Sequence, residues 1–288
     1  MPHARKDKLI DRLLAEGWFA TAGEALPWII AGKVLVGDQR AYSAAEIAPA
    51  NAEIRIKEYY KTKYVNKGGL KLEKALAEFN ASCGVDVCGK VALDCGASTG
   101  GFTDCLLRHG AGRVYAVDAG HGELAGKLLI NDKVVNMERT NISDARLKSL
   151  ALKPEIVTLD LSYLSLRLAV PICRDILAPG GTIIALIKPI VEVESSKIKR
   201  SGDVNRREVI AEVLRNLCGV FIAEGFDIAG LTYSPVRGNN GALEYFACLR
   251  PRTAVAEIAA NESLKSKINE IIEQSFLLNK FSKTRIQL

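Results

Sequence analysis

The stretch Leu93-Asp-Cys-Gly-Ala-Ser-Thr-Gly-Gly-Phe-Thr-Asp104 decides the fold class of this 288-residue chain. It follows a short apolar strand candidate, Val91–Leu93, and precedes a helix candidate over residues 102–109. Its glycines allow the backbone to turn sharply and to approach a ligand closely. A strand, a glycine-rich turn and a helix in this order are typical of the nucleotide-binding end of a parallel sheet.

Strand and helix candidates alternate from Lys71 to Arg250. The further strand candidates are residues 113–117, 134–135, 156–159, 182–187 and 245–249, and the helix candidates are residues 102–109, 122–129, 164–177 and 206–224. This alternation predicts an α/β, Rossmann-like parallel sheet with helices on both faces, whose last strand pairs antiparallel at the edge. Apolar residues at helical spacing after Thr253 predict an amphipathic helix that packs on the body or on a partner.

The first 60 residues follow another pattern and predict a small α+β domain. A helix is expected over residues 5–16, and a second one is expected after Thr21, which Pro27 should kink or shorten. Short strands are expected at 34–36 and 53–56. The expected organisation is a small domain (1–60), a basic linker (61–70), an α/β domain (71–250) and a C-terminal helical tail (251–288).

Basic residues gather in two places, although the net charge of +6 is modest. Tyrosines 59, 60 and 64 are interleaved with the first group, which suits contacts to phosphates and bases. Two solvated surface stretches would give the same pattern. The candidate RNA-binding residues are Arg55, Lys57, Lys61, Lys63, Lys67, Lys197, Lys199, Arg200, Arg206 and Arg207.

Several classes of protein do not fit the composition. No stretch approaches the roughly 20 apolar residues that a membrane helix needs. The N-terminus is charged and lacks the pattern of a signal peptide. The seven cysteines are scattered without Cys-x-x-Cys spacing, which predicts reduced thiols, no metal site and a cytoplasmic protein.

Asp118 indicates the kind of ligand. It ends the strand that follows the glycine loop, where a carboxylate can hold the two hydroxyls of a ribose. An adenosine-containing ligand is therefore expected, although a loop without a ligand would show the same residues. NAD is a rival, but its G-x-G-x-x-G spacing is absent. Asp94 before the loop would suit a cation, which favours S-adenosylmethionine without settling the choice. The candidate cofactor residues are Asp94, Gly96, Ala97, Ser98, Thr99, Gly100, Gly101, Phe102, Thr103, Asp118, Asn141 and Asp160.

Four further polar residues are candidates for catalysis. Asp160, Lys188 and Glu244 stand at strand ends or in adjoining loops, and Lys71 lies just ahead of the sheet. Because carboxyl ends of parallel strands converge, two lysines and two carboxylates could share one site. Each residue taken singly would also fit an ordinary surface ion pair.

This set would suit a sugar hydroxyl as nucleophile. The hydroxyl must lose its proton while it attacks the methyl carbon, so a base is needed. Lysine is charged at neutral pH, but a second ammonium and partial burial favour its neutral, proton-accepting form. Lys188 is the candidate base, because Pro189 fixes the chain beside it.

Four segments of the chain closely resemble the TlyA family. They are Asp94–Asp104, Ala116–Gly120, Leu161–Leu166 and Leu186–Pro189, and the resemblance covers most of residues 5–250. Members are often labelled hemolysins but are known as ribosomal RNA 2′-O-methyltransferases with an FtsJ-like catalytic domain.

The resemblance implies a class I methyltransferase fold, S-adenosylmethionine as cofactor, and ribosomal RNA or ribosomal subunits as partners. It also implies an RNA-binding front domain similar to that of a ribosomal small-subunit protein. The Lys-Asp-Lys-Glu tetrad of the family is matched here by Lys71, Asp160, Lys188 and Glu244.

The chain departs from the family pattern where RNA is expected to bind. Thr21-Ala22 replaces Ser-Arg, Asn66-Lys67 replaces another Ser-Arg, and Ile190-Val191 replaces Gln-Phe. Leu243 replaces an Asn, and Asp203-Val-Asn-Arg206 replaces Val-Arg-Asp-Pro. The target therefore stays open: a methyltransferase of a different RNA, a non-catalytic RNA-binding or ribosome-assembly factor that keeps the cofactor pocket, and a membrane-lysing protein are the alternatives.

Overall fold

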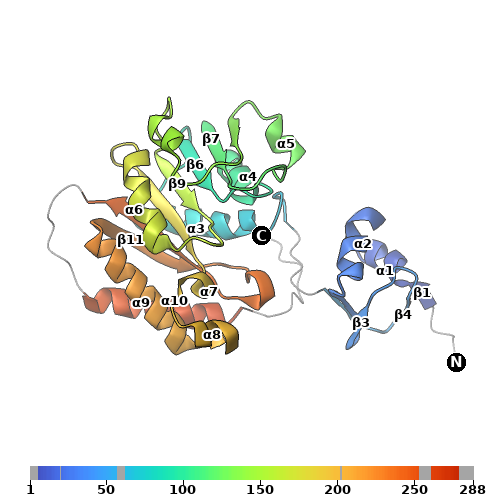
Figure 1. Cartoon of the computed structure of the whole chain (residues 1–288). Helices are drawn as coiled ribbons and strands as arrows, with labels where there is room; N and C mark the ends of the chain where they lie inside the picture. The colour runs from blue at the N-terminus through green and yellow to red at the C-terminus, as the bar shows by residue number, and fades with distance from the viewer. Residues whose placement is uncertain (1–5, 20, 57–61, 202, 253–260, 279–288) are drawn as a thin grey trace. The chain divides into compact units, whose positions relative to one another are not determined.

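The structure is a computed structural model of the chain and describes residues 6–19, 21–56, 62–201, 203–252 and 261–278. It divides into two compact units (Figure 1). One unit includes Met1–Lys61, and the other spans Thr62–Leu278.

The first unit is a small α+β fold, as the sequence predicts. Helices α1 (Leu9–Ala15) and α2 (Ala22–Ile30) accompany the pair β1 (Lys6–Lys8) and β4 (Ile47–Pro49), and a sheet of order β3-β2-β5. Strand β2 is Val34–Val36, β3 is Gln39–Ala41 and β5 is Ile54–Ile56. Thr21 caps α2 by accepting a hydrogen bond from the Glu24 amide. Pro27 was expected to kink or shorten this helix, but the helix continues through it to Ile30. Ala25 and Ile29, on either side of Pro27, are both buried in the core.

The second unit is built on a seven-stranded sheet of order β11-β12-β10-β9-β6-β7-β8. Its strands are β6 (Val91–Cys95), β7 (Arg113–Val117), β8 (Val134–Met137), β9 (Ile156–Leu159), β10 (Thr182–Ile187), β11 (Phe226–Tyr233) and β12 (Tyr245–Pro251). Strands β6 to β10 pair in parallel, while β12 is antiparallel to β10. The expected antiparallel strand is therefore present, but it is not at the edge.

Strand β11 forms that edge and pairs antiparallel with β12. The sequence did not indicate it. Its residues include the charged Asp227 and the glycine Gly230, and the pairing register shifts between Ile228 and Gly230. A bulged edge strand with these residues lacks the apolar run that marks the central strands.

Helices cover both faces of the sheet (Figure 1). They are α3 (Gly68–Cys83), α4 (Gly101–Arg108), α5 (Gly126–Leu129), α6 (Leu166–Ile176), α7 (Pro189–Glu192), α8 (Ser196–Ser201), α9 (Arg207–Ala223) and α10 (Asn261–Phe276). Short 3₁₀ helices span Ala145–Ser149, Asp203–Asn205 and Asn239–Gly241. The helix expected over 122–129 is confined to α5. Helix α3 was not expected, because its first turn is Gly68-Gly69, which sequence patterns assign to a linker.

The amphipathic helix expected in the tail is α10, which packs against α9 and β11. Ile268, Ile271 and Ile272 are buried, and the Ser275 hydroxyl lies 2.7 Å from the Tyr245 hydroxyl. Within the residues described, no helix has the length and apolar character needed to cross a membrane.

Candidate active site

A cavity of about 970 Å³ lies at the carboxyl ends of β6, β7, β9 and β10. All four residues of the expected tetrad line it: Lys71, Asp160, Lys188 and Glu244. Eight of the candidate cofactor residues line it as well: Gly96, Ala97, Ser98, Gly101, Phe102, Asp118, Asn141 and Asp160. The fold thus brings together residues that are as far apart in the sequence as Lys71 and Glu244.

The glycine loop passes the end of β9 so closely that a side chain would not fit. Gly96 has φ +85°, and a Cβ there would collide with the backbone carbonyl oxygen of Asp160. Its amide donates to the Val117 carbonyl at 2.9 Å, which fixes the loop to β7 as well. The loop is therefore held between the two strands that carry Asp118 and Asp160.

Two backbone amides hold the Asp118 carboxylate in place, one of them from the glycine loop. Its Oδ2 accepts a hydrogen bond from the Ser98 amide at 2.8 Å, and its Oδ1 accepts one from the Gly120 amide at 2.7 Å. The Ser98 hydroxyl donates to Glu123 at 2.8 Å, which helps to hold Ser98 at its positive φ of 46°. A carboxylate can accept about four hydrogen bonds, so Asp118 keeps the capacity to accept ribose hydroxyls.

The tetrad consists of two ion pairs that differ in exposure. Lys71 Nζ lies 2.5 Å from Glu244 Oε2, and both side chains are less than a tenth exposed. Lys188 Nζ lies 2.6 Å from Asp160 Oδ1 and donates to Ser162 Oγ at 3.1 Å. The second pair is more accessible, with side chains 15% and 21% exposed, so it can meet a substrate that enters the cavity.

The FtsJ-like methyltransferase family model matches residues 64–251. The chain belongs to that family. Hemolysin A of Brachyspira hyodysenteriae is 35% identical over 83% of this chain and 98% of its own length. The 16S/23S rRNA (cytidine-2′-O)-methyltransferase TlyA of Mycobacterium tuberculosis is 31% identical over 87% of this chain and 92% of its own. A solved structure from Streptococcus thermophilus, named as a candidate hemolysin, is 33% identical to this chain. The match has a TM-score of 0.70 and covers 95% of this chain and 98% of the other.

These relatives place the chain in the TlyA group of FtsJ-like proteins, as its motifs predict. It is a methyltransferase that uses S-adenosylmethionine. The cavity fits this cofactor in two respects: residues of the glycine loop between Gly96 and Phe102 line it, and the acidic groups Asp118, Glu123 and Asp160 in its lining suit a sulfonium that also carries an ammonium.

Asp94 was expected to contact a cationic ligand in the cavity, but the structure places it inside the fold. Its side chain is fully buried and does not line the cavity. It accepts hydrogen bonds from the hydroxyls of Thr103 (2.7 Å) and Thr158 (2.8 Å), and so it joins β6 to α4 and β9. Thr99, Gly100 and Thr103 also stand outside the lining, so these four candidates support the loop rather than face the cavity.

Burial raises the pKa of Asp94 from its ordinary 3.8 to about 6, while the two threonine hydrogen bonds oppose the shift. The folded protein therefore binds this proton more tightly than the unfolded chain does. The resulting stabilisation is complete below the unfolded pKa and is lost as pH rises through about 6.

We expect Asp94→Asn, which does not titrate, to reveal this loss. The free energy of unfolding of the wild type relative to the variant should fall by up to about 3 kcal/mol between about pH 3.5 and about pH 7.5, at about 1.4 kcal/mol per pH unit. Urea unfolding of both proteins at the two pH values measures it. A difference that stays constant with pH would show that Asp94 titrates normally.

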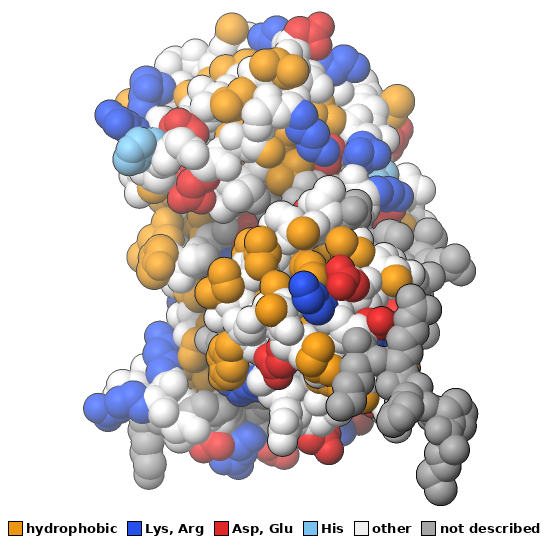
Figure 2. Space-filling view, turned by 90° about the vertical axis from the view of Figure 1, so that its right-hand side faces the viewer, with side chains coloured by type: hydrophobic (Ala, Val, Ile, Leu, Met, Phe, Trp, Pro, Cys, Tyr) orange, Lys and Arg blue, Asp and Glu red, His pale blue; other side chains and the backbone are white. Residues whose placement is uncertain are grey.

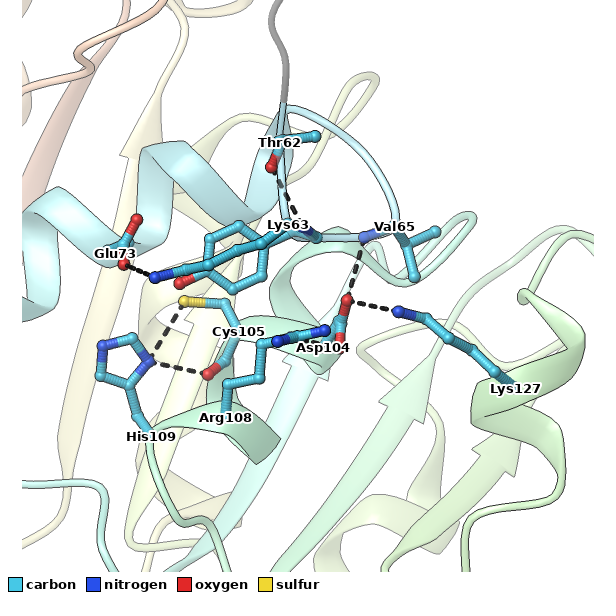
Figure 3. A network of polar contacts seen from close by, with 10 residues as sticks. Thr62, Lys63, Val65, Glu73, Asp104, Cys105, Arg108, His109 and Lys127 are labelled. Atoms are coloured by element: carbon cyan, nitrogen blue, oxygen red, sulfur yellow. Dashed lines mark hydrogen bonds and ion pairs between the residues drawn. The ribbon is translucent and has the colours of Figure 1, made fainter. Parts of the chain in front are cut away.

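The start of the second unit is fastened to the helix that follows the glycine loop (Figure 3). Asp104 of α4 is buried and accepts hydrogen bonds from the Val65 amide (2.9 Å), Lys127 (2.9 Å) and Arg108 (3.1 Å). One residue further, the Asn66 side chain donates to Thr99 and accepts from the Gly68 amide at 2.6 Å. The sequence marked Asn66 only as a departure from the family; in the structure it links the loop to the helix of Lys71.

Most of the candidate RNA-binding residues that the structure describes contact other parts of the protein. Lys67 lines the cavity and donates to the Arg237 carbonyl. Others hold intramolecular partners: Lys63 with Glu73, Arg55 with Asp38, Arg207 with Glu273, Arg206 with Glu208, and Lys199 with the Val191 carbonyl. Arg200 is exposed on α8. Lys57, Lys61 and the side chain of Lys197 lie outside the described residues. Figure 2 shows one face of the protein with its Lys and Arg side chains in blue.

Of two other departures from the family, one lines the cavity and one is buried beside it. Ile190 is 41% exposed in its lining. Leu243 is buried in the core, and its amide donates to the Asn205 side chain at 3.0 Å. Leu243 is therefore a packing residue beside Glu244, whereas Ile190 is available to a substrate.

Proposed function

We propose that this chain transfers the methyl group of S-adenosylmethionine to a ribose 2′-hydroxyl of ribosomal RNA. The observation that carries the proposal is the pair of lysine–carboxylate contacts, Lys71–Glu244 and Lys188–Asp160, in one cavity with the glycine loop. The names of the Mycobacterium tuberculosis and Campylobacter jejuni relatives, which describe rRNA (cytidine-2′-O)-methyltransferases, support the substrate class.

The cofactor is held, in this proposal, by the loop Gly96–Phe102 and by Asp118. Asp118 accepts the ribose hydroxyls, while Gly96 and Ala97 line the cavity beside it. Asn141 and Asp160 complete the lining. When bound, the cofactor supplies a methyl carbon made electrophilic by the positive sulfur.

Lys188 acts as the base in this mechanism. Its amine would accept the proton of the 2′-hydroxyl, while the bound cofactor would supply the methyl carbon to that oxygen, with the uncharged thioether as the leaving group. Asp160 and Ser162 contact Lys188 Nζ and orient it. In the same mechanism, the buried Lys71–Glu244 pair holds the attacking hydroxyl.

The RNA reaches this cavity, in our proposal, along basic residues outside it. Lys67 stands at the cavity itself, and Lys199 and Arg200 lie on α8, a few residues after Lys188. The front domain, the basic linker and the segment up to Arg207 contact phosphates, which position the RNA without reading its sequence. Activity on ribosomal RNA would place the enzyme in the cytoplasm.

Transfer of tritiated methyl groups to ribosomal subunits from a host that lacks the gene tests this proposal. We expect label in one subunit's RNA and none in subunits that already carry the modification. Absence of label from subunits, naked ribosomal RNA and total RNA, with cofactor binding intact, would contradict the proposal and favour a non-catalytic RNA-binding role. Label in another RNA class would retain the chemistry and reject the substrate.

A further inference from the structure

Glu192 is a buried carboxylate that the catalytic scheme leaves without a role. It ends α7, the short helix that follows Lys188 directly, and is only 2% exposed. It does not line the cavity, although its neighbours Ile190 and Val191 do. A carboxylate is costly to bury unless hydrogen bonds and a counter-charge compensate. The groups that contact Glu192 therefore indicate its role.

Its partners are the first residues of α6. Glu192 Oε2 accepts a hydrogen bond from the Ser165 hydroxyl at 2.6 Å, and Oε1 accepts one from the Leu166 amide at 2.9 Å. A negative charge at a helix N-terminus is stabilised by the helix dipole. Arg167 adds a second link, since it donates to the Glu192 carbonyl at 3.0 Å and lies 3.9 Å from Oε2.

These bonds join the same two loops that form the Lys188–Asp160 pair. The loop after β9 runs from Asp160 to Ser165, and the segment after β10 runs from Lys188 to Glu192. At one end Lys188 contacts Asp160 and Ser162, and at the other end Glu192 contacts Ser165 and Leu166. Two backbone hydrogen bonds stabilise the turn between the ends, since the amides of Val191 and Glu192 both donate to the Lys188 carbonyl.

We propose that Glu192 is a positioning residue for Lys188. It fixes the loop of residues 160–165 against the Lys188 segment, so that Asp160 and Ser162 hold the lysine amine at the angle that the reaction needs. This role rests on the proposed function of Lys188. A misplacement of about 1 Å at a reacting group can cost about 100-fold in rate.

Turnover and cofactor affinity of three variants test this role. Glu192→Ala removes both bonds to α6 and should lower kcat by about 10- to 100-fold, with the Kd for S-adenosylmethionine within about threefold of wild type. Glu192→Gln keeps the shape, with an amide oxygen for Leu166 and an NH₂ for Ser165, and should restore most of kcat. Glu194→Ala is the matched control: Glu194 is exposed and contacts the same Arg167, at 3.4 Å, and its loss should leave kcat unchanged.

Ser165→Ala provides a second variant if Glu192→Ala does not fold, because it removes only one of the two bonds to Glu192, together with the Ser165 cap on the Arg167 amide. It should lower kcat several-fold at unchanged cofactor affinity. Normal kcat in both Glu192→Ala and Ser165→Ala overturns the positioning role. So does an equal fall in kcat and cofactor affinity, or a Glu192→Gln variant as impaired as Glu192→Ala.

Hydrogen exchange of the amides of residues 161–166 separates this proposal from the proposed function. Exchange should accelerate in Glu192→Ala and not in Glu194→Ala, whether or not the wild type methylates RNA. An inactive wild type with accelerated exchange in Glu192→Ala would reject the proposed function and leave the coupling of the two loops standing. Unchanged exchange would reject the coupling itself.

Discussion

Lys188→Ala is expected to lower methyl transfer by about 10²- to 10⁴-fold, the usual contribution of a general base. The affinity for S-adenosylmethionine should stay within about threefold of wild type, because Lys188 contacts Asp160 and Ser162 rather than the glycine loop. Single-turnover methyl transfer and calorimetric titration of the cofactor measure the two quantities.

Lys188→Arg is the control that separates a base from a fixed positive charge. A guanidinium can keep the ion pair with Asp160, but it stays protonated in proteins and cannot accept the proton of the hydroxyl. It should therefore be about as impaired as Lys188→Ala. A Lys188→Arg enzyme with wild-type turnover would assign Lys188 to charge stabilisation and remove it from the base role.

Gly96→Ala is expected to lower the affinity for S-adenosylmethionine by about 100-fold. A left-handed backbone costs about 1–2 kcal/mol in an L-residue, and here the added Cβ also meets the Asp160 carbonyl. The loop must shift away from β9, and the shift displaces the Asp118 and Ser98 contacts with it. Calorimetric titration, after circular dichroism has confirmed the fold, measures the loss.

Gly126→Ala is the matched control, because a Cβ at Gly126 meets nothing within 4 Å and its φ is not in the left-handed region. Its cofactor affinity should equal that of the wild type. Equal affinity in Gly96→Ala would show that the close approach of the loop to β9 is not needed for cofactor binding.

The central strands were predictable because burial on both faces gives them continuous apolar runs, as in Thr182–Ile187. The same argument explains the failures. Strand β11 carries Asp227 and Gly230 at a sheet edge, and helix α3 begins with two glycines, so neither has the local pattern of its class. In both cases tertiary packing, against β12 and against α4, decides the structure.

The placement of the four candidate residues in one cavity was predictable, because strand ends converge at one edge of a parallel sheet and the motifs mark the residues near those ends. What the sequence could not show is which way each side chain points. Asp94 follows the same apolar strand as the loop but faces Thr103 and Thr158 inside the fold. No sequence pattern indicated the contacts of Glu192, and Asn66 was marked only as a departure from the family, since these contacts join segments that are distant in the chain or in different loops.

Nucleoside analysis of the methylated product tests the central claim most directly. Ribosomal RNA methylated by the wild-type protein would be digested to nucleosides and analysed by mass spectrometry, with Lys188→Ala as the control. The account predicts one nucleoside with its methyl group on the ribose, at near-stoichiometric yield with the wild type and nearly absent with the variant. A methyl group on the base, or equal yields from both proteins, would contradict it.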